Sequence, residues 1–306
     1  QSRNILHNGS GHSLRAALYH EEKGSGKLME SRSKAANRAI FISMIILSVV
    51  FLAPIFIVLM NSFKGQFFIS DAPFVLPTAQ TYVGGKNYVN GIEKTGFISA
   101  FGYSLFITVF SVMAITLCTS MTAWFIVRVK NRLTSGLYYL FTFSMIVPFQ
   151  MVMFTMSKTA NALGLDNPVG IILIYLGFGA GLSVFMFSGF VKSIPIEIEE
   201  AAMIDGCNPI QTFFLIVFPI LKPTAITVSI LNTMWIWNDY LLPYLVIGNK
   251  YRTIPIAVQY LQGGYGSKDM GALMAMLVLA IIPIVVFYLS AQKYIIKGVV
   301  SGAVKG

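Results

Sequence analysis

Charged residues are scarce in this sequence. Asp, Glu, Lys and Arg make up only 11% of the 306 residues, whereas 56% are hydrophobic and the mean hydropathy is +0.72. A water-soluble globule needs more polar side chains than this to cover its surface. The composition therefore excludes an ordinary soluble protein and predicts an integral membrane protein.

Cysteine and histidine are also rare. The two cysteines, Cys118 and Cys207, lie far apart, which favours free thiols over a disulfide framework. The histidines all lie in the amino-terminal tail, at His7, His12 and His20, so we expect no metal site. The segment Gly24-Ser25-Gly26-Lys27 is not a phosphate-binding loop, because Glu21 and Leu28 replace the required glycine and Ser or Thr. We therefore expect no metal and no cofactor in this chain.

Long apolar runs dominate the chain after a polar segment. Residues 1–38 lack periodicity and are expected to form a flexible cytoplasmic tail. Residues 39–306 are expected to form one membrane domain with six spans. About 20 helical residues cross the hydrocarbon core of a bilayer. The apolar runs predict an all-α integral membrane protein with six transmembrane helices, at about 39–63, 100–127, 133–157, 168–191, 223–246 and 270–292. Proline is expected to interrupt several of them, including the third at Pro148.

The basic residues indicate how the chain is oriented. The net charge of +10 could suggest nucleic acid, but Lys and Arg of a membrane protein collect in cytoplasmic segments. If the amino terminus is cytoplasmic, most of the 22 basic residues lie inside, and those outside are Lys64, Lys86, Lys94, Lys158, Lys250, Arg252 and Lys268. We therefore expect both termini and the loop 193–222 in the cytoplasm, and no nucleic-acid partner.

The loop 193–222 is the one acidic, turn-rich segment between two apolar runs. Its residues from Pro195 to Ile204 have a helical pattern, with three glutamates near the positive end of the helix dipole. Gly206 is the residue type that ends a helix in a left-handed turn. Asn208 followed by Pro209 is a typical helix start. The sequence predicts a helix-turn-helix, with the second helix running to about Val217 and ended by the prolines at 219 and 223.

This loop resembles the EAA motif of permease subunits in binding-protein-dependent ABC importers. The matching residues are Glu200-Ala201-Ala202, Asp205-Gly206, Ile216 and Phe218-Pro219, with Phe218 where leucine is commonest. A second resemblance, to the smaller permease subunit of the maltose-type carbohydrate subfamily, rests on Trp237-Asn238-Asp239, on Leu242-Pro243 and on the carboxy-terminal segment from Gln292 to Gly306.

The resemblance implies a type I ABC importer permease in a bacterial or archaeal inner membrane. Its expected partners are a second, unlike permease subunit, two copies of an ABC ATPase that binds ATP and Mg, an extracytoplasmic sugar-binding protein, the sugar substrate and membrane lipid. The chain itself would not be an enzyme. The residues expected to couple it to the ATPase are Glu200, Ala201, Ala202, Asp205, Gly206 and Pro219, and those of a tail that reaches the ATPase are Val304, Lys305 and Gly306.

An acidic residue interrupts the fifth apolar run. The surrounding residues are aromatic or amide-bearing, as groups that meet sugar rings and hydroxyls often are: Trp235, Trp237, Asn238, Asp239 and Tyr240. They are candidates for the translocation path or an outer gate, but an interfacial anchor with helix packing explains the same composition.

Two other functions remain open from the sequence. An ABC importer permease for a non-sugar solute would share the EAA motif. An ion-coupled secondary transporter would need ionisable groups in several spans, but Asp239 is the one that we find. A membrane enzyme is disfavoured, because the spans contain no paired carboxylates, histidine cluster or nucleophile constellation.

Overall fold

The computed structural model describes residues 10–262 and 268–303, and it divides the chain into two units, Gln1–Ile57 and Val58–Gly306. Helix α1 (Ser10–Asn61) continues from the first unit into the second. It therefore begins well inside the segment for which the sequence predicted a tail without periodicity. The absence of proline before Pro54 is compatible with this long helix. Its residues Ala36–Asn61 are long and apolar enough to cross a membrane.

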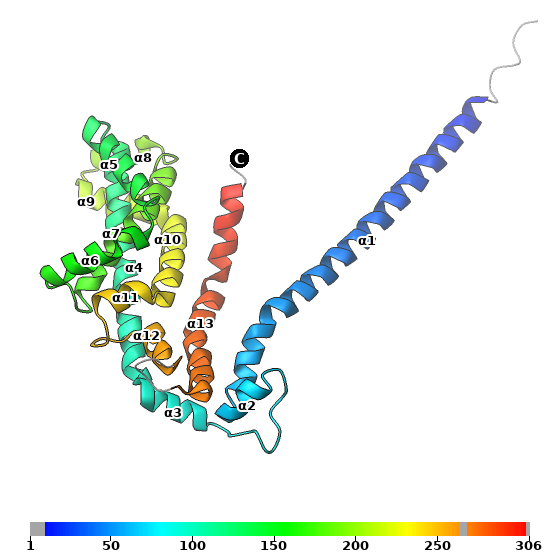
Figure 1. Cartoon of the computed structure of the whole chain (residues 1–306). Helices are drawn as coiled ribbons and strands as arrows, with labels where there is room; N and C mark the ends of the chain where they lie inside the picture. The colour runs from blue at the N-terminus through cyan, green and yellow to red at the C-terminus, as the bar shows by residue number, and fades with distance from the viewer. Residues whose placement is uncertain (1–9, 263–267, 304–306) are drawn as a thin grey trace, which may run out of the picture. The chain divides into compact units, whose positions relative to one another are not determined.

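Three helices form the centre of the second unit: α4 (Phe97–Arg128), α7 (Gly170–Val191) and α10 (Phe218–Asn238). The contact between α4 and α7 is the most extensive between helices of the described residues (Figure 1). A Cβ atom on Gly179 of α7 would lie 2.6 Å from Cδ1 of Ile115 in α4, so any larger residue would force the buried Ile115 side chain to shift. Ile115, Tyr175 and Phe187 are fully buried at the centre.

The third predicted span is not one straight helix. The chain forms α5 (Arg132–Ser144) and α6 (Phe149–Ala162), which are bent by 107° relative to each other. Pro148 lies between them with extended backbone angles, and its missing N–H prevents a continuous helix. The interruption predicted at Pro148 is confirmed. Of the described helices, five are long and apolar enough to span a membrane, and this bent pair would be a sixth.

Prolines 219 and 223 do not end a helix, contrary to the sequence prediction. After α8 (Ile196–Ile204), the chain continues from α9 (Pro209–Gln211) through a π-helical stretch, η1 (Thr212–Val217), directly into α10. The N–H of Phe218 bonds to the carbonyl of Phe213, five residues back. A π turn widens the helix just where the ring of Pro219 would otherwise clash with the carbonyl four residues earlier. Pro223 is accommodated inside α10.

The fifth predicted span, 223–246, begins and ends earlier than expected, at Pro209 and Asn238. Helix α10 ends at Asn238, the backbone of Asp239 is extended, and a separate short helix follows, α11 (Leu241–Val246). The polar side chain of Asp239 starts this new helix, as described below. The apolar run therefore contains a break that its composition alone does not reveal.

A second hydrophobic cluster lies at the opposite end of α4 from α8. It involves α3 (Lys86–Thr95), α12 (Ile254–Gln259), the 3-10 turn η2 (Tyr260–Gln262) and the start of α13 (Met270–Ala303), while α2 (Gln66–Asp71) precedes them in the chain. Figure 1 shows α8 and α3 at opposite ends of this unit. We call these the α8 end and the α3 end. The N–H of Ile254 donates to Oγ of Ser104 in α4 at 2.8 Å, which attaches α12 to the central helices.

Candidate functional site

The helix α8 has the boundaries and the C-terminal turn that the sequence predicted. Gly206 has a φ of +91°. The N–H of Cys207 donates to the carbonyl of Ala202 at 3.0 Å, and the N–H of Gly206 donates to the carbonyl of Met203 at 3.1 Å. This pair of hydrogen bonds is a Schellman motif, which needs a left-handed residue after the helix. A Cβ atom on Gly206 would meet nothing within 4 Å, so the backbone conformation, rather than space, requires glycine here.

The two faces of α8 differ in burial. Glu199 and Ala202 face the protein interior, with exposed fractions of 3% and 7%. The opposite side is open to the surroundings, and Ile204 is 85% exposed. The predicted coupling residues are therefore divided: Ala202 is buried, whereas Glu200, Ala201, Asp205 and Gly206 are exposed. The open face combines carboxylates with apolar side chains and small residues, as a surface that binds another protein closely would.

Glu199 is held by the last two turns of α4. Its Oε1 accepts hydrogen bonds from Nη2 and Nε of Arg128, at 2.6 and 2.9 Å, and its Oε2 accepts one from the indole N–H of Trp124 at 2.9 Å. Nη2 of Arg128 also donates to the carbonyl of Ile194, at 3.0 Å. We call Trp124, Arg128 and Glu199 the α4–α8 clamp. Paired and hydrogen-bonded in this way, a buried carboxylate and guanidinium are stable out of water.

The sequence analysis missed this clamp. In the sequence, Glu199 is only one of three close glutamates, with Glu197 and Glu200, and Arg128 is only one of the basic residues expected on the cytoplasmic side. The available signal was periodicity: Glu199 and Ala202 are three residues apart and so share a helix face, and Trp124 and Arg128 are four apart at the end of an apolar run. The 71 residues that separate Arg128 from Glu199 in sequence gave no indication that the two faces meet.

The start of the next helix has the predicted cap. Asn208 Oδ1 accepts from the N–H of Gln211 at 2.9 Å, and the Gln211 side chain accepts from the N–H of Asn208 at 3.0 Å, which is a capping box. Phe213 packs its ring 5.5 Å from that of Trp124. Pro219 lies further along, in α10, where it lines a groove of about 480 Å³ between α10 and α13. It is thus part of the helix that follows rather than of the turn after α8.

Asp239 organises the break between α10 and α11. Its Oδ1 accepts hydrogen bonds from the N–H groups of Leu241 and Leu242, at 3.0 and 3.3 Å, and its Oδ2 accepts one from the hydroxyl of Tyr175 at 3.1 Å. The first two contacts are those of a helix cap. The ring of Trp235 packs edge-on to that of Tyr175, with centroids 5.4 Å apart. Asp239 and Trp235 therefore form a packed polar cluster with Tyr175, a residue that the sequence analysis did not identify.

The other three candidates near this break border a different space. Trp237, Asn238 and Tyr240 line a cavity of about 340 Å³ together with Gln259, Gln262 and apolar residues of α12 and α13. The indole N–H of Trp237 donates to the carbonyl of Ala280 at 3.4 Å, and the side-chain amide of Asn238 donates to the carbonyl of Met234 at 2.7 Å. The lining of the cavity thus combines amide and aromatic groups with aliphatic ones.

The metal-ligating residue types and the predicted tail contacts complete the description of the site residues. Among the described residues, no group of three His, Cys, Asp or Glu side chains is arranged to hold a metal ion. The predicted tail contacts Val304, Lys305 and Gly306 lie outside the residues that the structure describes.

The long apolar helices of the described residues define a multi-span membrane protein. The chain matches the family model described as "Binding-protein-dependent transport system inner membrane component" over residues 115–301, and it belongs to this family. It is 39% identical over 263 residues to the probable starch degradation products transport system permease protein AmyC of Thermoanaerobacterium thermosulfurigenes, covering 85% of this chain and 94% of that protein.

Two other similarities agree with this assignment. The multiple sugar-binding transport system permease protein MsmG of Streptococcus mutans is 34% identical over 262 residues, which cover 84% of this chain and 93% of that protein. A chain in the crystal structure of a bacterial ABC transporter involved in the import of the acidic polysaccharide alginate has a TM-score of 0.67 at 20% identity. That alignment covers 95% of this chain and 99% of the other, and it supports the fold.

Proposed function

We propose that this chain is a membrane-spanning subunit of an ATP-driven importer, where it forms half of the translocation path for a sugar or oligosaccharide. The observation that carries the proposal is α8: a short helix that is clamped to α4 on its inner face and open on its outer face, with the EAA residues Glu200 and Ala201 exposed. An ATPase subunit of the importer would bind this outer face. Glu200 would make a charged contact, and Gly206 would allow close approach.

The substrate class follows from the relatives. The proteins AmyC and MsmG are named for starch degradation products and for multiple sugars, respectively. A sugar or oligosaccharide is therefore favoured over a non-sugar solute. The cavity beside Trp237, Asn238 and Tyr240 supports this choice, because its amides can bind hydroxyl groups while its apolar wall meets the faces of sugar rings. In this proposal Asp239 and Trp235 shape the path by fixing the α10–α11 break.

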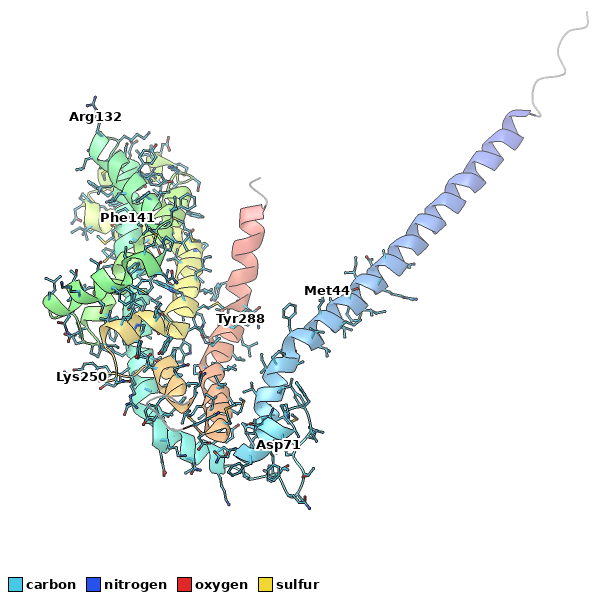
Figure 2. All side chains as sticks on the ribbon, viewed as in Figure 1. Met44, Asp71, Arg132, Phe141, Lys250 and Tyr288 are labelled. Atoms are coloured by element: carbon cyan, nitrogen blue, oxygen red, sulfur yellow. The ribbon has the colours of Figure 1, made fainter. Side chains whose placement is uncertain are left out.

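The subunit would work in an assembly. Its partners would be a second, unlike permease, two copies of an ABC ATPase that bind ATP and Mg, and a sugar-binding protein on the outer side. Both termini and the α8 end would face the cytoplasm of a bacterial or archaeal cell, which fits the basic residues Lys130 and Arg132 between α4 and α5 at this end. Figure 2 shows the Arg132 side chain pointing away from the helices at this end. The carboxy-terminal residues 304–306 would reach toward the ATPase.

The proposal is tested by transport in reconstituted vesicles. The full chain, copurified with its associated subunits, is placed in liposomes with ATP inside and with the binding protein and radiolabelled sugars outside. We expect uptake that requires ATP hydrolysis and stops when the ATPase is inactivated. Uptake of an amino acid but of no sugar would favour the non-sugar importer. Uptake driven by an ion gradient without ATP would favour the secondary transporter.

A further inference from the structure

We infer that the α4–α8 clamp is the joint through which α8 passes its displacement to the membrane-spanning helices, and that Trp124, Arg128 and Glu199 are positioning residues for coupling. The inference rests on the proposed function, because it assumes that an ATPase moves α8. It concerns residues outside the EAA motif that lie on the hidden face of the helix.

The covalent connections of α8 are poor transmitters of force. On its amino-terminal side the chain passes through Pro195, where the backbone leaves the helical conformation, and on its carboxy-terminal side it passes through the left-handed Gly206. Both are points at which the chain changes direction between helices. A displacement of α8 would bend the chain there unless a side-chain contact held the helix to its neighbour.

The clamp provides that contact at three points. The carboxylate of Glu199 is bound through both oxygens, one to the guanidinium and the other to the indole. The guanidinium of Arg128 also holds the carbonyl of Ile194, in the turn before α8. Helix and preceding turn are therefore fastened to the same residue of α4. One carboxylate oxygen accepts two N–H groups and the other accepts a third. These bonds fix the orientation of α8 as well as its distance from α4.

Helix α4 is suited to carry the movement onward. It packs along α7 through the close approach at Gly179 and against α10, where the hydroxyls of Thr116 and Ser229 are 3.0 Å apart. At the α3 end it binds the first residue of α12 through Ser104. Packed helices move as rigid elements, so a push on α8 reaches α7, α10 and α12 through α4.

The three neighbouring glutamates of α8 differ in their surroundings, so substitutions at them test different claims. Glu197 and Glu200 are exposed, whereas the carboxylate of Glu199 is turned inward and fully bound. A change at Glu200 would disturb the surface offered to the ATPase. A change at Glu199 would leave that surface intact and loosen the helix that carries it. A change at Glu197, which is also on the open face, would act on that surface and leave the clamp intact.

The test compares a charge-free clamp with the intact one. The double variant Arg128→Gln with Glu199→Gln leaves no unpaired charge in the interior, and Trp124→Phe removes the indole N–H while it keeps a ring against Phe213. Glu93→Gln, at an exposed position of α3 far from the clamp, is the matched control. Each full chain is copurified with its associated subunits, and both sugar uptake and ATP hydrolysis are measured in liposomes. We expect the double variant to hydrolyse ATP but to transport about tenfold less sugar per ATP than the wild type. Trp124→Phe should show a smaller loss and the control none.

A distance measurement makes the inference testable without transport. Cys118 and Cys207 are changed to Ser, and spin labels are attached at Lys130→Cys, after α4, and Met203→Cys, on the exposed side of α8. The wild type should give one narrow distance distribution, unchanged by ATP, and the double variant a broad one.

The outcomes separate the two claims. Absence of ATP-driven uptake in the wild type contradicts the proposed function. Wild-type sugar-to-ATP ratios in the double variant, or equally narrow distance distributions in both proteins, contradict the joint. If the double variant does not assemble, Trp124→Phe and Arg128→Lys decide the question. Retention of normal coupling by both would overturn the inference.

Discussion

The two ends of the α4 region each have an ion pair of the same length and very different surroundings. At the α8 end, Nη2 of Arg128 lies 2.6 Å from Oε1 of Glu199, and the two side chains are 17% and 4% exposed. At the α3 end, Nζ of Lys94 lies 2.6 Å from Oδ2 of Asp269, but the side chains are 42% and 11% exposed. Water therefore screens the second pair far more than the first.

The difference shows that two ion pairs of equal length can contribute very differently to the free energy of unfolding. The buried carboxylate of Glu199 is paired with Arg128 and Trp124, so loss of one partner leaves a buried polar group without compensation. Asp269 has a second task, since its Oδ1 accepts from the N–H of Ala272 at 3.0 Å and so caps α13. Lys94 adds less than the cap does, because its side chain is 42% exposed and water screens its charge.

The largest effect is expected when the buried pair is broken from one side. Arg128→Ala should lower the free energy of unfolding by about 3–5 kcal/mol, because the carboxylate of Glu199 then lies in the interior without its cation. Denaturant titration in mixed micelles, followed by circular dichroism, measures the change. Arg132→Ala is the control, as the side chain of Arg132 points away from the helices (Figure 2). Equal effects of the two substitutions would contradict the distinction between buried and exposed charge.

A second substitution disturbs the α8 end without touching the ion pair. Gly206→Ala and Gly206→Leu should each lower stability by about 1–2 kcal/mol, because both place a Cβ atom on a left-handed residue. Both variants should fold, since space around Gly206 is open. We expect Gly206→Leu alone to lose transport while it retains ATP hydrolysis, because its bulk projects from the surface proposed to contact the ATPase. Wild-type sugar uptake per ATP in Gly206→Leu would show that this surface is not a close contact.

The smallest effect is expected at the α3 end. Lys94→Ala should lower stability by less than about 1 kcal/mol at neutral pH. A larger loss than that caused by Arg128→Ala, in the same denaturant titration, would reverse the comparison between the two ends.

The pH dependence at the α3 end has a defined sign. Burial acts to raise the pKa of Asp269, but the N–H of Ala272 and the ammonium of Lys94 outweigh it and hold this pKa below the usual 3.8. Since the folded pKa is lower than the value of about 3.9 in an unfolded chain, the stabilisation is present above that value and is lost as the pH falls through the folded pKa. Asp269→Asn should therefore be less stable than the wild type at pH 6, and the difference should shrink in acid. A difference that grows as the pH falls would contradict this assignment.

Much of the fold was predictable from local patterns. Apolar runs identified the regions of the long helices, and Gly206 and Asn208 predicted the turn after α8 because left-handed glycine and an N-cap depend on neighbouring residues alone. Pro148 likewise predicted the bend between α5 and α6. These features require no knowledge of what packs against them.

The remaining features depend on packing between distant parts of the chain. The side chain of Glu199 is turned inward only because α4 lies beside α8, and Asp239 is fixed by Tyr175 of α7. The π turn before Pro219 is stabilised where Phe213 packs against Trp124. A single sequence does not reveal such partners, so it predicted the helix α8 and the turn at Gly206 but neither the continuation through Pro219 nor the separate roles of the three glutamates.

The contact made by the open face of α8 tests the account most directly. A photocrosslinking amino acid is placed at Ile204, which is 85% exposed on α8, and in a separate variant at Tyr139, which is 69% exposed on α5. The purified assembly is irradiated, and the crosslinked products are identified by mass spectrometry. We expect position 204 to crosslink to an ATPase subunit, with a yield that changes when ATP is bound, and position 139 to give no such product. Crosslinks from position 204 to lipid alone would contradict the proposed role of α8.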